Sequence, residues 1–230
     1  MSKDTRSFDP TFATADRGTA QSASSTPFNI HDRRSNYSWS DFDRRHVLQG
    51  YYVFEVPFGR GRAFGSDIPK ALDFIVGGWQ LSGSFLWGSG RPFTVYSGVN
   101  TFSNVVSSTA NCNGCPRNMG RLIQRDGTTF WFSEEDVNRF SVPAPGEQGN
   151  TPRNYFIGPR QFLANAALKK KFRFTERYSF DLGVESTNVT NNTNWLIPVA
   201  TATSSTLGSL RTSLSSSGSR KIQFSGRLNF

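Results

Sequence analysis

The chain has 230 residues, enough for one large domain or two small ones, and 14% of them are aromatic, with 21 Phe and five Trp. No stretch approaches the roughly 20 apolar residues of a membrane-spanning helix, whereas a membrane-spanning strand needs an apolar residue only at every second position. The net charge of +9 raises the question of nucleic acid. However, the basic residues are dispersed and no nucleic-acid-binding motif accompanies them, so we expect no nucleic-acid partner.

Residues 1–44 are polar and rich in turn-forming pairs such as Asp9-Pro10 and Arg17-Gly18. Residues 1–6 carry no apolar stretch typical of a signal peptide. We therefore interpret 1–44 as an extracellular loop or an incomplete N-terminal segment, and we expect the export signal to lie upstream.

The first predicted strand covers residues 45–56, where one face is apolar through Leu48, Tyr52, Phe54 and Val56. Pro57 and the glycines after it end this strand. Residues 68–76 predict a short helix that stops at Gly77-Gly78.

The second strand, 79–88, alternates more clearly, with its apolar face formed by Trp79, Leu81, Gly83, Phe85 and Trp87. Residues 97–161 then form a long polar region, which we expect to be a loop.

The third strand, 162–174, and the fourth, 178–188, are joined by only three residues, so they must be antiparallel neighbours. Lys170 interrupts the apolar face of the third strand. Residues 191–219 predict a second long loop. The last strand, 222–230, has the clearest pattern of all, with an apolar face formed by Ile222, Phe224, Gly226, Leu228 and Phe230.

These elements predict an all-β fold, namely an antiparallel transmembrane β-barrel fragment of about five C-terminal strands with long extracellular loops. The strands have the roughly 9–11 residues that a tilted membrane crossing requires. Short turns belong on the periplasmic side of such barrels and long loops outside. Five strands cannot close a single-chain barrel, so we expect either a larger polypeptide or several copies. A terminal strand packed on a soluble sandwich core would show the same alternation.

Four sequence blocks follow one another in a characteristic order, beginning with Asp41-Phe42-Asp43-Arg44-Arg45-His46. The others are Val56-Pro57-Phe58-Gly59-Arg60-Gly61-Arg62, Gly77-Gly78-Trp79-Gln80-Leu81-Ser82-Gly83 and Ser89-Gly90-Arg91-Pro92-Phe93-Thr94-Val95. From about residue 41 to the end, the chain resembles the C-terminal part of the Oar-like branch of TonB-dependent outer-membrane receptors. Residues 172–177 and 223–230 resemble the closing strands of that family.

The resemblance implies a 22-stranded barrel in the outer membrane of a Gram-negative-type bacterium, to which residues 45–230 contribute the last strands. It implies substrate uptake by the whole receptor and not by this chain alone, which has no plug or TonB box. The partners implied are outer-membrane lipid, the rest of the barrel and the plug, and TonB through the missing part. It also implies that the barrel-assembly machinery reads the terminal strand through Ile222, Phe224, Leu228 and Phe230.

Cys112 and Cys115 have the spacing of a redox or half-zinc motif, but no second pair exists, so we favour a local disulfide. For Asp41 and Asp43 we expect charge balance by the arginines that follow, not a cation site. Residues 134–136 suggest a solvated turn or the start of a short helix. His31 and His46 complete no catalytic triad. We therefore predict neither an enzyme nor a cofactor or metal site.

Three functions remain open on the sequence alone. The leading one is the barrel of an uptake receptor. The second is a surface or adhesive barrel without transport, and the third is a soluble β-sandwich that binds carbohydrate through exposed Trp and Tyr.

Overall fold

The structure, a computed structural model, describes residues 3–4, 29, 31–103, 107–175, 177–211 and 219–230. Most of the predicted loop 1–44 and part of the predicted loop 191–219 lie outside these residues, as does Glu176 in the predicted turn. The chain divides into two compact units. The strand unit comprises Leu48–Trp87, Phe162–Thr193 and Ser217–Phe230, and the loop unit comprises Met1–Val47, Gly88–Gln161 and Asn194–Ser216.

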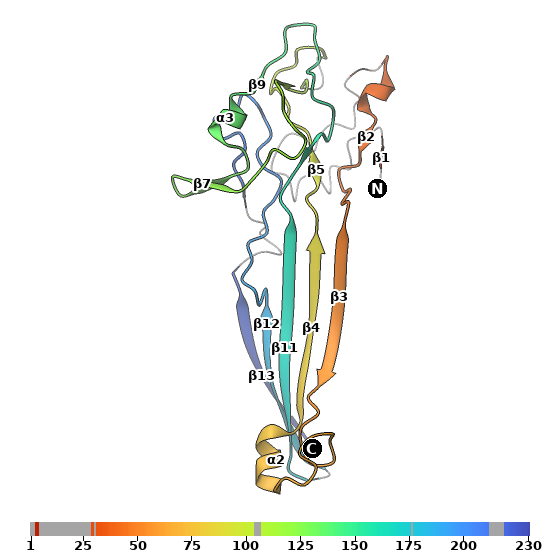
Figure 1. Ribbon diagram of the computed structural model, residues 1–230, viewed down its shortest axis with the longest axis vertical. Coiled ribbons are helices and arrows are strands. Elements are labelled where there is room, and N and C mark those ends of the chain that lie inside the picture. The colour runs from red at the N-terminus through yellow and green to blue at the C-terminus, as the bar shows by residue number, and fades with distance from the viewer. Residues whose placement is uncertain (1–2, 5–28, 30, 104–106, 176, 212–218) are drawn as a thin grey trace. The chain divides into compact units, whose positions relative to one another are not determined.

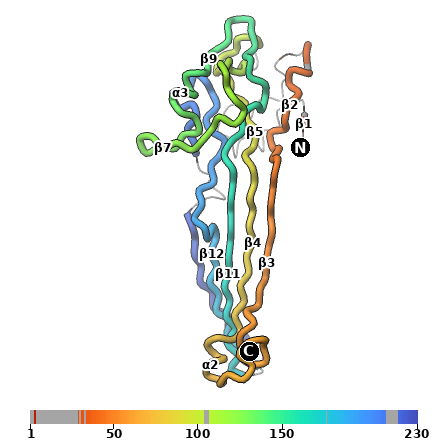
Figure 2. Tube along the Cα trace, in the orientation of Figure 1, coloured from red at the N-terminus to blue at the C-terminus, as the bar shows by residue number. Residues whose placement is uncertain are grey.

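A five-stranded sheet forms the strand unit, with the strands side by side in the order β13-β12-β11-β4-β3 (Figures 1 and 2). These strands are β3 (Val47–Glu55), β4 (Trp79–Gly88), β11 (Gln161–Arg173), β12 (Ser179–Thr187) and β13 (Lys221–Asn229). All five predicted strands are confirmed, and their ends differ from the predicted ones by at most two residues.

The antiparallel register of β11, β12 and β13 sets the two faces of the sheet. Leu168 lies opposite Val184, which lies opposite Phe224. One position along each strand, Lys169 lies opposite Gly183, and Gly183 opposite Ser225. Because directly opposed residues share a face, the register confirms the predicted separation into an apolar and a polar face.

Aromatic rings cover two glycines where β3 meets β4. A Cβ atom at Gly50 would lie 2.8 Å from the ring of Phe85, and one at Gly83 would lie 2.7 Å from the hydroxyl oxygen of Tyr52. Each glycine leaves room on its strand for a ring from the next strand, an arrangement that helps to hold register in β-sheets.

Helix α2 (Lys70–Val76) lies in the connection between β3 and β4. The predicted helix is confirmed, although it begins at Lys70 and not at Ile68, because Pro69 occupies the N-cap. Gly78 has φ of 71°, and a Cβ there would lie 2.7 Å from the carbonyl oxygen of Lys171. The ring of Phe74 packs on that of Phe172 with centroids 5.0 Å apart, which ties the helix to the sheet.

The loop unit contains short elements. They are β1 (Lys3–Asp4), a 3-10 helix (Arg33–Asn36), β2 (Ser38–Trp39), β5 (Pro92–Phe93), β6 (Asn111–Cys112), β7 (Ile123–Arg125), β8 (Thr128–Phe130), α3 (Glu134–Val137), β9 (Phe140–Ser141) and β10 (Phe156–Ile157). They pair as four two-stranded sheets, β1 with β2, β5 with β10, β6 with β9 and β7 with β8.

A hydrophobic core holds the loop unit together. The rings of Phe93, Phe132 and Phe156 are each 1% exposed, and their centroids lie 5.9–6.1 Å apart. Val95, Ala110 and Leu207 join them in the same cluster. The segments predicted as long loops therefore form a packed unit, which the polar composition of 97–161 did not indicate.

Candidate functional site

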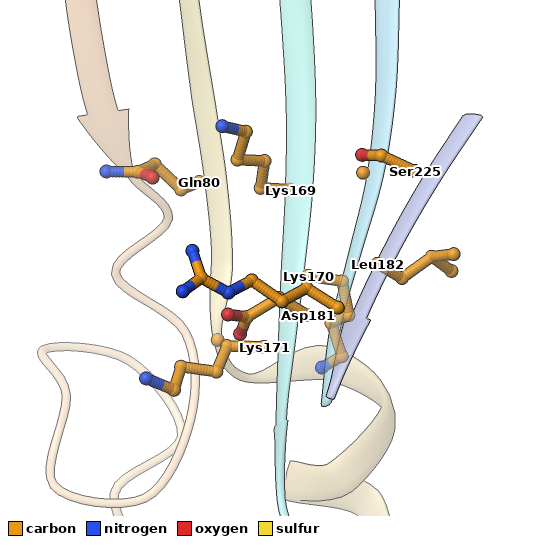
Figure 3. A pocket seen from close by; sticks show the side chains of 10 residues that line it. Gln80, Lys169, Lys170, Lys171, Asp181, Leu182 and Ser225 are labelled. Carbon is orange, nitrogen blue, oxygen red and sulfur yellow. The ribbon is translucent and has the colours of Figure 1, made fainter. Parts of the chain in front are cut away.

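The polar face of the strand unit carries a groove of about 420 Å³. Its lining includes Gln80 of β4, Lys169 and Lys171 of β11, Asp181 of β12 and Ser225 of β13. Figure 3 shows Gln80, Lys169, Lys171 and Asp181 pointing to the same side of the sheet, whereas Leu182 points away from them. Polar side chains from four strands thus form one surface.

Positive charge predominates along this polar face. Asp181 lies opposite Lys171 on one side and Arg227 on the other, and its Oδ2 accepts a hydrogen bond of 3.0 Å from Asn229 Nδ2. Lys169 Nζ lies 3.7 Å from the Glu185 carboxylate. In the register, Lys169, Lys171, Arg173, Lys221 and Arg227 share this face with the two carboxylates. This face of the sheet is therefore hydrophilic and carries a net positive charge.

The opposite face of the strand unit is apolar and exposed. Leu182 is 39% exposed, Leu228 60% and Phe224 73%. Exposed apolar surface on this scale marks contact with a membrane or another protein. In a soluble sandwich these side chains would be buried, so their exposure does not support that alternative.

Lys170, which interrupts the apolar pattern of β11, is 2% exposed although it lies on the apolar face opposite Leu182. Its Nζ donates a hydrogen bond to the Gly77 carbonyl oxygen, directly after the end of α2. The same Nζ lies 5.3 Å from the ring centroid of Trp79 and 5.2 Å from that of Phe172. A carbonyl at a helix C-terminus and two aromatic faces therefore accommodate its charge.

The four predicted assembly residues all lie on or directly after β13, the strand at one edge of the sheet. Ile222, Phe224 and Leu228 share the apolar face of β12 and β13, and Phe230 is 86% exposed. The structure thus places them together and accessible, while their role in assembly stays a prediction.

Cys112 and Cys115 form a disulfide in the loop unit, with Cα atoms 5.8 Å apart. The Asn150 side chain forms hydrogen bonds with both backbone groups of Cys112. Cys112 N donates to Asn150 Oδ1 at 2.8 Å, and Asn150 Nδ2 donates to the Cys112 carbonyl oxygen at 3.3 Å. The pair closes a short turn beside β6.

The predicted turn at residues 134–136 is helix α3. Ser133 caps it, since its Oγ accepts from Asp136 N at 3.1 Å while Ser133 N donates to the Asp136 carboxylate at 3.2 Å. This capping box explains the acidic run as a helix start, as predicted. In the described residues, no group of three or more His, Cys, Asp or Glu side chains is placed to hold a metal ion. The absence of catalysis stays a prediction.

Asp41 has a long-range partner that the residues around it in the sequence do not indicate. Its Oδ1 lies 3.6 Å from Arg153 Nη1 and accepts a 2.6 Å hydrogen bond from Asn154 Nδ2. The side chains of Asp41 and Arg153 are 4% and 1% exposed. Arg153 Nε also donates to the Asn36 carbonyl at 3.0 Å. No local pattern links residues so far apart in the chain.

Comparison with protein families identifies the class of this chain. The family described as outer membrane beta barrel domain matches residues 5–223, and the chain belongs to it. Comparison with curated proteins found no match, and neither did comparison with solved structures. None of the helices in the described part of the chain has the length and apolar character that a membrane crossing requires.

The chain is thus an outer-membrane β-barrel protein of a Gram-negative bacterium. We expect the apolar face of the strand unit to face lipid and the basic polar face to line the barrel interior, because strands of such barrels alternate in this way. The connections from β4 to β11 and from β12 to β13 are the long ones and meet the same end of the sheet. By the rule of short periplasmic turns, we expect that end to be extracellular.

Proposed function

We propose that the chain forms part of the barrel of a TonB-dependent receptor of the Oar-like branch, which takes up substrate across the outer membrane. This proposal rests on the resemblance to the Oar-like branch. Three residues of the four sequence blocks that show this resemblance have an unusual backbone conformation or are buried. Gly59 has φ of 128°, Gly78 has φ of 71°, and Asp41 is buried against Arg153.

The two open edges of the sheet are the observation that supports a larger barrel. Within the described residues, β3 and β13 each have a neighbour on one side only. In hydrocarbon, every unpaired backbone group costs several kcal/mol, so only closed barrels span membranes as strands. Further strands of a receptor barrel would pair with both edges. Transport would then belong to the whole receptor, with a plug in the lumen and energy supplied through TonB.

The test uses the native protein in the bacterium that produces it. An epitope tag is placed at the exposed turn around residues 144–147, and the tagged polypeptide is isolated from outer membranes after cross-linking in cells. We expect mass spectrometry to find plug-domain peptides in the same polypeptide and TonB among its cross-linked partners. A polypeptide with neither would contradict the receptor role and favour a surface barrel without transport.

Phe230 provides a separate prediction on assembly. An exposed edge strand can be recognised by strand addition, and Phe230 continues the apolar face of β13. Phe230→Asp in the full-length protein is expected to lower its amount in the outer membrane by about tenfold or more, because a charge replaces an apolar group at the lipid boundary. Ser225→Asp is the matched control, since Ser225 lies on the polar face opposite Gly183 and faces no carboxylate directly across the strands. Equal losses in both variants, measured by immunoblots of membrane fractions, would refute a face-specific signal.

A further inference from the structure

Three cations surround the ring of Trp39 in the loop unit. Lys3 Nζ lies 5.0 Å from the ring centroid, Arg117 Cζ 4.7 Å and Arg45 Cζ 5.9 Å. The pairing of β1 with β2 places Lys3 directly opposite Trp39. Each distance is within the range of a cation–π attraction. Three positively charged side chains therefore lie around one indole ring.

The three cations of this cluster differ in exposure, and the Asp43 carboxylate lies near one of them, Arg117. Lys3 and Arg45 are exposed and Arg117 is half-buried. Burial, followed by the nearby charge of Arg45, lowers the pKa of Arg117, whereas the Asp43 carboxylate opposes this shift. The Nε of Arg117 is buried and has no hydrogen-bond partner. Leaving such a group unpaired is costly, so this guanidinium gains from a negative charge placed beside it.

We propose that Lys3, Arg45 and Arg117 form a binding site for a phosphate group beside Trp39. A phosphate monoester offers a charge of about −1.5 to −2 and three acceptor oxygens. Guanidinium groups bind such oxygens through two parallel hydrogen bonds. The anion would relieve the repulsion between Arg45 and Arg117.

The position of Arg45 in the chain bears on the source of the phosphate. Val47, the first residue of β3, follows Arg45 by two positions, so Arg45 lies within about 7 Å of the strand's first residue. We expect that end of β3 to be the extracellular one. A phosphorylated lipid headgroup of the outer leaflet and a soluble phosphorylated ligand share the chemistry that the site requires, and the experiment below distinguishes them. This inference rests on the barrel assignment and does not require the receptor role.

The test measures binding of diphosphorylated lipid A, and separately of inorganic phosphate, to the full-length protein purified in nonionic detergent and freed of bound lipid. The variants are Arg45→Gln/Arg117→Gln and Arg45→Gln alone, whose exposed side chain leaves folding intact. The control, Arg121→Gln/Arg160→Gln, removes the same charge at two other exposed positions of the loop unit. We expect the first double variant to bind lipid A at least about tenfold more weakly, the single variant several-fold, and the control within about twofold.

Competition by inorganic phosphate distinguishes the two sources. Displacement of lipid A only at high phosphate concentration supports the lipid headgroup, and binding of free phosphate as tight as that of lipid A supports a soluble phosphorylated ligand at the same site. Equal weakening in the control variant would reduce the effect to general charge and overturn the proposal. Absence of binding of both probes to the unaltered protein would overturn it as well.

Discussion

Asp41→Ala is expected to destabilise the loop unit by about 3–5 kcal/mol, because it leaves the buried guanidinium of Arg153 without its carboxylate. The side chains are 4% and 1% exposed, so water cannot replace the lost partner. Asn154 Nδ2 loses its 2.6 Å acceptor at the same time. We expect the thermal transition of the loop unit to fall well below that of the strand unit, measured as the temperature at which a protease cleaves residues 107–160.

Glu134→Ala is the matched control in the same unit. It also removes one carboxylate from an arginine pair, with Arg125 Nη1 2.5 Å away, but Glu134 is 76% exposed. Exposed pairs contribute about 0–1 kcal/mol, so the control is expected to shift the cleavage temperature only slightly. Similar shifts in the two variants would show that burial of the Asp41–Arg153 pair is not what stabilises the unit.

The strand unit could be predicted from sequence because its rules are local. Each strand shows an alternation of apolar and polar residues and a length that suits a membrane crossing. These two features assign its faces without knowledge of the neighbouring strand. The three-residue connection predicted between the third and fourth strands indicated their antiparallel pairing, which β11 and β12 show. Even the interrupted alternation at Lys170 did not change the assignment, although only the structure shows that Gly77, Trp79 and Phe172 accommodate its charge.

The loop unit could not be predicted in the same way because long-range contacts define it. Phe93, Phe132 and Phe156 come from three distant segments that show no common period. The Trp39 cluster likewise joins Lys3, Arg45 and Arg117, which are separated by loops. The sequence showed short basic clusters but not which of them converge. Candidate binding residues in this protein therefore came from the structure, whereas the membrane-facing residues came from the sequence.

The assignment of the apolar face to lipid predicts a large loss of barrel stability when Phe224, near the middle of β13, is replaced by a charged residue. Phe224→Arg is expected to destabilise the assembled barrel by about 2–4 kcal/mol, because the charge would lie in hydrocarbon near the bilayer midplane. Phe224 is 73% exposed and lies opposite Val184 on the apolar face, so no acidic side chain is paired with it across the strands. The measurement is urea unfolding of the full-length protein in lipid vesicles, followed by the loss of its folded electrophoretic mobility.

Gln223→Arg provides the comparison, since it introduces the same side chain one residue away on the opposite face. Gln223 lies opposite Glu185, so its arginine would enter the watery interior beside a carboxylate, and cross-strand pairs of opposite charge contribute about 0.2–1 kcal/mol in favour of the sheet. We therefore expect the unfolding midpoint to fall for Phe224→Arg and to stay or rise for Gln223→Arg. Comparable destabilisation by both would mean that β13 does not separate lipid from lumen, and the barrel orientation derived from the register would have to be abandoned.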